Sequence, residues 1–153
     1  LEFRRVLFRS GTTTTLATSD DPGHSNFIIS DASPYDWRNP QNDNLWQGES
    51  GINNPCPVGW RLPTDTEWET EKDSWSSQNL TGAFGSPLKL PVAGYRYSNN
   101  GTLQNEGFYG LYWSYSISSQ DNTCADYVMF WNSAAIMTHN YRANGYSVRC
   151  IKD

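Results

Sequence analysis

The sequence predicts a single α+β domain, because one well-marked helix is followed by several aromatic-rich strand candidates. A length of 153 residues suits one domain and is enough to bury a substantial core. Aromatic residues make up 14% of the chain, whereas disordered chains are poor in them, so we expect the chain to fold. The net charge of −5 argues against a nucleic-acid-binding protein, which normally presents a basic face.

The N-terminal residues do not look like part of the domain. Residues 1–10, LEFRRVLFRS, hold three of the eleven basic residues and resemble adapter-derived sequence at the ends of metagenomic reading frames, so we leave them out of the fold prediction. Residues 11–25 are predicted to be a linker, because this stretch is rich in Thr, Ser and Gly. The domain is expected over residues 26–153. The sequence shows no membrane span and no signal peptide, which fits the C-terminal part of a longer exported protein.

The first half of the domain alternates short strands with a long loop. Residues 26–30 are predicted to form a strand. Residues 31–54 are dense in Asp, Asn, Gly and Pro, so we expect a long ordered loop whose Trp37 and Trp46 insert into the body of the domain. A second strand is expected at 58–62, ending at Pro63.

A helix is predicted over residues 65–76. Thr64 and Glu67 match a capping box, in which each side chain bonds the backbone N–H of the other residue. Trp68 and Trp75 are seven positions apart and therefore share one face of this helix. The sequence shows no second helix of similar quality.

Beyond residue 87 the sequence predicts β-structure. Residues 88–95 alternate, with Leu88, Leu90 and Val92 on one side. Aromatic-rich strands are expected at 107–116 and 125–131, a turn at 140–144 and a final strand at 146–151.

Motifs for catalysis and for zinc are lacking in the sequence. The three cysteines form no C-x-x-C pair, and only two histidines are present, which argues against a zinc site. Three cysteines in an exported protein predict one disulfide and one spare thiol. There is no G-x-S-x-G motif, and His139 has no nucleophile at a recognisable spacing, so we expect a solvated histidine and no enzyme activity.

Three blocks of the sequence resemble a known family, the Fibrobacter succinogenes major paralogous domain. The blocks are NPCPVGWRLPT at 54–64 followed by Glu67-Trp68, SPLKLPVAGYR at 86–96, and Tyr112-Trp113-Ser114 with GYSVRC at 145–150. The resemblance covers about residues 26–151. It implies a C-type-lectin-like fold, with one well-formed helix packed on an antiparallel sheet and long ordered loops. It also implies a bacterial origin of the Bacteroidetes type and a place on the cell surface or outside the cell.

The same resemblance assigns roles to the framework residues. The two ends of lectin-like domains meet in one sheet, which implies a Cys56–Cys150 disulfide and an unpaired Cys124; two buried free thiols are the alternative. Arg61 and Arg149 are expected to be structural partners of carboxylates such as Glu67, the alternative being ligand-binding arginines. Formylglycine-generating enzymes share this fold and use a cysteine pair, but the motif cysteines here look structural, so that activity is not carried over.

Calcium is the one cofactor that the sequence leaves open. Many sugar-binding lectins hold calcium through a Glu-Pro-Asn or Gln-Pro-Asp triplet and a Trp-Asn-Asp, whereas this chain has Trp131-Asn132-Ser133 and no such triplet. Residues 39–43, NPQND, supply oxygen ligands of the type that calcium prefers, but such runs are usually plain turns. We therefore predict no metal site and no other cofactor.

Residues 111–149 have the composition of a binding surface. They contain no Lys and no Glu but many Tyr, Ser and Asn, as protein interfaces and antibody paratopes do. An aromatic β core would account for Trp113, Phe130 and Tyr146, but not for the mixed run at 136–143. That run also resembles the variable region of diversity-generating retroelement proteins, in which adenine-directed mutagenesis replaces residues within a constant frame. On this hypothesis Val128 and Phe130 hold the scaffold, and the ligand-binding residues are Tyr115, Ile117, Asp126, Met129, Trp131, Ser133, Met137, His139, Asn140 and Tyr141.

The leading functional hypothesis is thus a non-catalytic, diversified ligand-binding domain displayed on a cell, pilus or phage particle. Its partner would be a protein or glycan on a cell or phage surface. A fixed-specificity adhesin or glycan-binding module, or a structural C-terminal module of a wall or fibre protein, are the alternatives. Variation confined to residues 115–144 among related sequences would favour the first.

Overall fold

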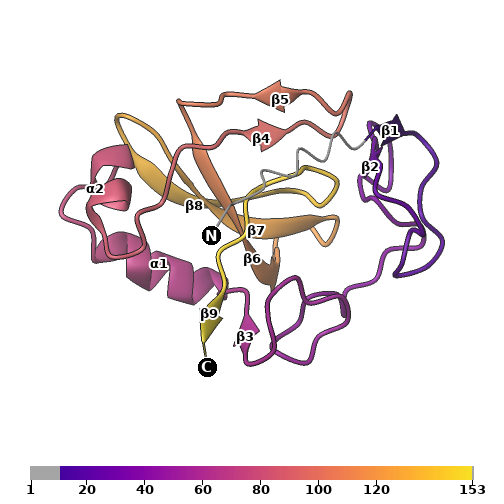
Figure 1. Cartoon of the computed structure of the whole chain (residues 1–153), viewed down its shortest axis with the longest axis horizontal. Coiled ribbons are helices and arrows are strands. Elements are labelled where there is room, and N and C mark those ends of the chain that lie inside the picture. The colour runs from indigo at the N-terminus through magenta and orange to yellow at the C-terminus, as the bar shows by residue number, and fades with distance from the viewer. Residues whose placement is uncertain (1–10, 153) are drawn as a thin grey trace, which may run out of the picture.

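The chain folds as a mixed α+β domain, as predicted. A computed structural model describes residues 11–152, so the prediction for residues 1–10 lies outside the described residues. Two short helices lie on one side of a three-stranded antiparallel sheet, and short two-stranded pairs and long loops surround it (Figure 1). The helices and strands are β1 Thr12–Thr13, β2 Phe27–Ile28, β3 Trp60–Arg61, α1 Asp65–Asp73, α2 Leu80–Gly85, β4 Tyr95–Arg96, β5 Leu103–Gln104, β6 Gly110–Ile117, β7 Cys124–Phe130, β8 Ala135–Tyr141 and β9 Ile151–Lys152.

The central sheet has the order β6-β7-β8. Tyr112 pairs with Val128, and Val128 pairs with Met137, so these three residues share one face of the sheet. The β6–β7 register is irregular between Trp113 and Ile117, at the end of β6 that lies beside the start of β7. The sequence predicts no strand at β8; it predicts a variable run at 136–143 and a turn at 140–144. In the structure the strand extends to Tyr141, and the turn follows it.

Helix α1 covers one face of the sheet through Trp68, and Trp75, which follows the end of the helix, is buried in the same cluster. They pack with Tyr112, Val128 and Phe130, and the Phe130 ring meets that of Trp75 edge-on at 5.4 Å. The predicted capping box is present in full: the Thr64 hydroxyl accepts from the N–H of Glu67 at 3.0 Å, and the Glu67 carboxylate accepts from the N–H of Thr64 at 2.8 Å. The helix ends at Asp73, three residues earlier than predicted.

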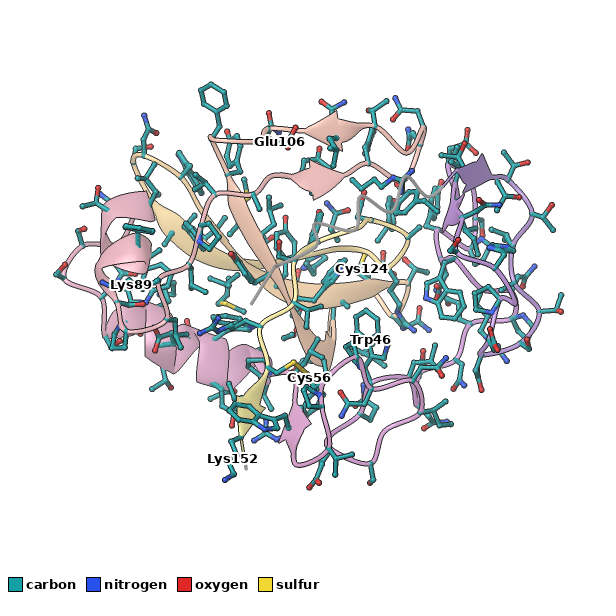
Figure 2. All side chains as sticks on the ribbon, in the orientation of Figure 1. Trp46, Cys56, Lys89, Glu106, Cys124 and Lys152 are labelled. Atoms are coloured by element: carbon teal, nitrogen blue, oxygen red, sulfur yellow. A yellow bond between two sulfur atoms is a disulfide. The ribbon has the colours of Figure 1, made fainter. Side chains whose placement is uncertain are left out.

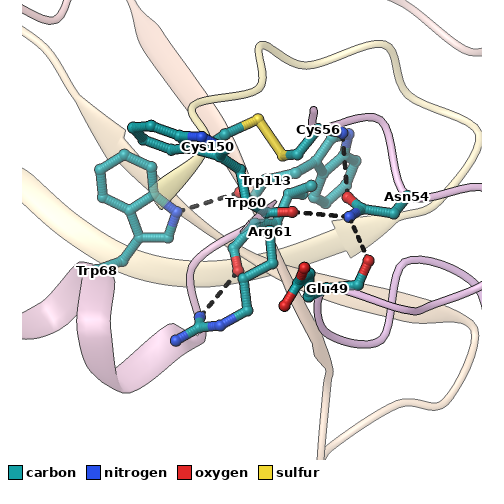
Figure 3. The surroundings of a disulfide bond; sticks show 9 residues. Glu49, Asn54, Cys56, Trp60, Arg61, Trp68, Trp113 and Cys150 are labelled. Carbon is teal, nitrogen blue, oxygen red and sulfur yellow. Dashed lines mark hydrogen bonds between the residues drawn. A yellow bond between two sulfur atoms is a disulfide. The ribbon is translucent and has the colours of Figure 1, made fainter. Parts of the chain in front are cut away.

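A second aromatic cluster fills the opposite face. Trp113 stacks on Tyr146 with ring centroids 4.3 Å apart, and Tyr127 meets both rings. Leu62 is fully buried beside them. Figure 3 shows the Cys56–Cys150 disulfide next to this cluster, where β3 pairs with β9. The predicted pairing is confirmed, and Cys124 is free and buried.

Residues 11–54 form the side of the molecule opposite the helices (Figure 1). β1 pairs with β2, and Ala17 is buried, so part of the segment predicted as a linker is packed onto the domain. Residues 31–54 contain no helix and no named strand, as expected for a long loop. Trp46 reaches from this loop to the aromatic cluster, as predicted (Figure 2).

Two further predictions differ from the structure. The α2 helix was missed because its six residues, LTGAFG, include two glycines; its start is fixed by Asn79, whose side chain accepts from the N–H groups of Thr81 and Gly82. Residues 88–94 lie in no strand. Leu88, Leu90 and Val92 still pack in the α1-side core, although Lys89 has a left-handed backbone (φ 52°) and the segment is not a regular strand.

Candidate functional site

The ten predicted ligand-binding residues do not share one surface. Strand register places Asp126, Met137 and His139 on the face that α1 covers. Met129 packs into the aromatic cluster of the opposite face. Trp131 and Ser133 lie in the β7–β8 turn, about 20 Å from the far end of the seven-residue β8 at 3.3 Å per residue. β-strand alternation therefore sends neighbouring residues along β7 and β8 to opposite faces of the sheet.

Most of the ten residues are also less exposed than predicted. Ser133 is exposed, whereas the other nine are partly buried. Trp131, predicted as an anchor for the ligand, packs against Tyr109 with ring centroids 6.0 Å apart. Met137 packs against the α1-side core.

Four of the ten residues line recesses at one end of the sheet. Tyr115 and Ile117 lie near the end of β6, and Asn140 and Tyr141 end β8. At this end the long loop 31–54 packs against the sheet and three recesses adjoin; we call them the loop-end recesses. The first and second share Trp37, Trp46, Trp113 and Arg142, and the second and third share Asn144.

Arg142 is the charged centre of the first recess. Its guanidinium lies 2.8 Å from the Asp43 carboxylate and 3.9 Å from that of Asp36. Asp36 is almost fully buried, and burial raises the pKa of its carboxyl above the usual value although Arg142 opposes the shift. Trp37, Trp46 and Tyr115 line the same recess. The recess therefore combines aromatic walls with a few converging polar groups, the usual chemistry of a ligand site.

The third recess is built from tyrosines, and we call it the tyrosine recess. Tyr35 from the long loop stacks on Tyr141 with ring centroids 4.1 Å apart. Tyr95 and Tyr97, from the β4 region, line the same recess, and their rings meet edge-on at 6.1 Å. Asp31 is exposed and also lines it. The volume of the recess is about 300 Å³.

Hydrogen bonds hold the floor of the tyrosine recess in place. The buried Asn144 accepts from the N–H of Ser98 at 3.1 Å and donates to the carbonyl of Tyr141 at 3.3 Å. The Asn140 amide donates to the Tyr146 hydroxyl at 2.9 Å. Polar groups that are fixed in this way before a ligand arrives lose less conformational freedom on binding.

A second group of polar residues lies beside the start of α1. Asp126 and His139 face each other across β7 and β8, and the Ser116 hydroxyl donates to the Asp65 carboxylate at 2.8 Å. Burial, with the nearby Asp65 charge adding to it, raises the pKa of Asp126. Within residues 11–152 no hydrogen bond joins His139 to a serine or a carboxylate. The nucleophile–base contact of a catalytic triad is thus not formed among these residues.

The free thiol and the candidate calcium ligands are accounted for by local contacts. Burial raises the pKa of the Cys124 thiol, which disfavours the reactive thiolate. In residues 39–43, which offer oxygen ligands of the type that calcium prefers, Asp43 pairs with Arg142, and the Asn42 amide donates to the Asp20 carboxylate at 2.9 Å. Among residues 11–152 no group of three or more His, Cys, Asp or Glu is placed to hold a metal ion.

Sequence reasoning missed the contribution of the long loop. Asp36, Trp37 and Asp43 line the first recess, as do Trp46 and Arg142, yet none of them was predicted to bind a ligand. The signal was present: tryptophans and carboxylates in a long loop are a common source of binding residues. The loop was instead interpreted as scaffold. Arg61, in contrast, forms the predicted ion pair with Glu67 at 2.7 Å, whereas Arg149 is exposed.

Comparison of the chain with family models, with curated proteins and with solved structures finds no match. Neither helix in the part of the chain that the structure describes has the length and apolar character that a membrane crossing requires.

Proposed function

We propose that this chain is a C-type-lectin-like domain that binds another molecule without catalysis and is displayed outside a bacterial cell or on a phage particle. The observation that carries the proposal is the cluster of loop-end recesses, where aromatic rings and polar groups converge; Arg142 lines the first two recesses, and tyrosines line the third. The Cys56–Cys150 disulfide supports an oxidising compartment. The pairing of β3 with β9 beside that disulfide supports a fold of this type, in which the two ends of the domain meet.

The binding proposal is tested by selecting ligands and then asking where they bind. The immobilised full chain is screened against a random-peptide phage library and a glycan array. Selected ligands are then titrated against Tyr141→Ala, at the loop end, and Trp131→Ala, at the opposite end of the β7–β8 hairpin. We expect at least a tenfold loss of affinity for the first variant, because truncating a central aromatic residue of an interface often costs about 2 kcal/mol, and little change for the second.

Two outcomes contradict the proposal. Either no ligand is selected from these libraries, or the selected ligands bind both variants as tightly as the unaltered chain. Melting curves of both variants provide the control, since a loss of binding counts only where the variant remains folded at the assay temperature.

We also propose that residues 115–144 are diversified by a retroelement. Tyr115, Ile117, Asn140 and Tyr141 lie at or near strand ends and line the recesses, so different side chains there change the ligand surface. Tyr115 also packs against the aromatic cluster, and Asn140 also bonds Tyr146. Val128 and Phe130 are fully buried and suit constant positions. Sequencing this locus from many cells of one population is expected to show substitutions concentrated at the four recess positions, with a template repeat and a reverse transcriptase gene nearby. Uniform variation along the chain would contradict the proposal and favour a structural module.

A further inference from the structure

The charge around the loop-end recesses is unevenly distributed. Residues 11–54 hold six acidic residues and one arginine, whereas residues 55–152 hold eight acidic and seven basic residues. The one arginine, Arg38, is already paired with Asp20 at 2.9 Å. Asp36 and Asp43 are paired with Arg142, but residues 11–54 still carry an excess of negative charge, which attracts cations and repels anions.

The tyrosine recess lies within this negative region and lacks a basic lining residue. Its aromatic walls are Tyr35, Tyr95, Tyr97 and Tyr141, and its charged group is Asp31. No ion pair of Asp31 is found within residues 11–152. A phosphate or carboxylate in this recess would meet a carboxylate without a counter-charge, so an anionic ligand is disfavoured.

The two neighbouring arginines are directed elsewhere. Arg96 lies between Tyr95 and Tyr97 in an extended segment, and its guanidinium sits over the Phe27 ring at 4.5 Å. Arg142 follows Tyr141 and is held by Asp36 and Asp43 in the first recess. Neither arginine is among the residues that line the tyrosine recess.

The phenol groups complete the chemistry. Burial is the main cause that raises the pKa of Tyr95, and the neighbouring Tyr97 adds to it. Burial also raises the pKa of Tyr141. Both hydroxyls therefore stay protonated at neutral pH. Neutral tyrosine rings attract cations through their electron-rich faces, and carboxylates pair with ammonium and guanidinium groups.

We propose that the tyrosine recess binds a cationic group, a lysine or arginine side chain of a partner polypeptide, held among the four tyrosine rings and by the Asp31 carboxylate. The inference rests on the proposed binding function and adds the class of ligand. Hydrogen bonds join the lining residues Ser98, Asn144 and Tyr141, so this part of the recess is ordered before a side chain binds.

The test uses blocked amino acids as probes. The ¹⁵N-labelled full chain is titrated by NMR with N-acetyl-lysine methylamide, N-acetyl-arginine methylamide and the neutral N-acetyl-norleucine methylamide, and with choline as a free quaternary ammonium. We expect saturable shifts at Asp31, Tyr35, Tyr97 and Tyr141 for the lysine or arginine probe. The dissociation constant of the lysine or arginine probe should be on the order of millimolar and at least tenfold lower than that of the norleucine probe. Its binding should weaken severalfold between 50 and 500 mM salt, because salt screens exposed charges.

A matched pair of variants isolates the charge. Asp31→Asn changes a carboxylate to an amide in the recess, and we expect at least a fivefold loss of affinity for the cationic probes. Glu69→Gln makes the same change at an exposed position of α1 and is expected to leave affinity unchanged. Because both sites are exposed, neither variant is expected to compromise folding.

The outcomes separate this inference from the proposed function. Equal binding of norleucine, or equal binding by Asp31→Asn and the unaltered chain, overturns the cationic class but leaves a ligand site in place. Tighter binding of choline than of both amino-acid probes overturns the choice of a polypeptide side chain. Absence of shifts in the recess with every probe overturns the inference, while the library selection described above decides the proposed function independently.

Discussion

Glu67 joins α1 to β3, and replacing it by glutamine is expected to destabilise the domain. Its carboxylate accepts two hydrogen bonds from Arg61, at 2.7 and 2.8 Å, and one from the N–H of Thr64 at 2.8 Å. The hydrogen bonds from Arg61 lower the pKa of Glu67 from 4.5 to about 2 and are the largest cause of this shift. Partial burial opposes the shift, and the hydrogen bonds from Thr64 add to it. At 1.36 kcal/mol per pKa unit this difference corresponds to about 3 kcal/mol. The Glu67 side chain is 39% exposed, so solvent screening reduces the expected loss to about 1–2 kcal/mol.

The pH dependence of this loss has a definite sign. A carboxyl whose pKa is lower in the folded state stabilises the protein above the unfolded pKa, and the stabilisation disappears as the pH falls through the folded pKa. Urea unfolding of the unaltered chain and of Glu67→Gln is measured from pH 7 to pH 2.5. We expect the free energies of unfolding to differ by the full amount at pH 7 and to converge between about pH 4.5 and pH 2. A difference that stays constant with pH, or one no larger than that of Glu69→Gln, would refute this reasoning.

Three further predictions follow from the framework. Thr64→Ala is expected to cost about 1 kcal/mol in urea melts through loss of the N-cap, without changing ligand affinity. Non-reduced peptide mapping should recover the Cys56–Cys150 pair. Because the disulfide closes a loop of 94 residues, its removal by double substitution should lower the free energy of unfolding by about 4–5 kcal/mol in the chain-entropy model. A reduced form as stable as the oxidised one would show that the unfolded chain is already compact. Phe130→Ala is expected to lower the free energy of unfolding by about 3–5 kcal/mol, because the Phe130 side chain is fully buried. Tyr141→Ala should lower it far less in the same thermal scan. Similar losses for both variants would show that the rim of the recess is part of the core.

The framework of the fold could be predicted because each element carries a local signal. The capping box at Thr64 and Glu67 defines the start of α1, and aromatic-rich runs mark the strands around Trp113 and Phe130. The disulfide came from the resemblance, not from spacing. β8 escaped prediction because its sequence, AIMTHNY, has no clear alternation: both of its faces are partly buried, so apolar and polar side chains occur on each.

The candidate site was harder to predict than the fold. Composition alone identified the C-terminal third, yet strand alternation divides those residues between two faces, and Met129 and Met137 show that some of them are core. The recesses depend on contacts between segments that are far apart in the sequence, such as Tyr35 with Tyr141 and Asp36 with Arg142. Such contacts leave no periodic pattern in either segment.

The buried Cys124 gives this protein a built-in reporter of opening at the loop end. Cys124 begins β7 and pairs with Tyr141 at the end of β8, and its thiol is protected while that pairing is intact. A thiol reagent can react only after the two strand ends separate, so the labelling rate measures how often this end of the sheet opens. A partner that spans Tyr35 and Tyr141 would hold the ends together and slow the reaction. Occupancy of the recess could then be followed by mass spectrometry without an added probe on the protein.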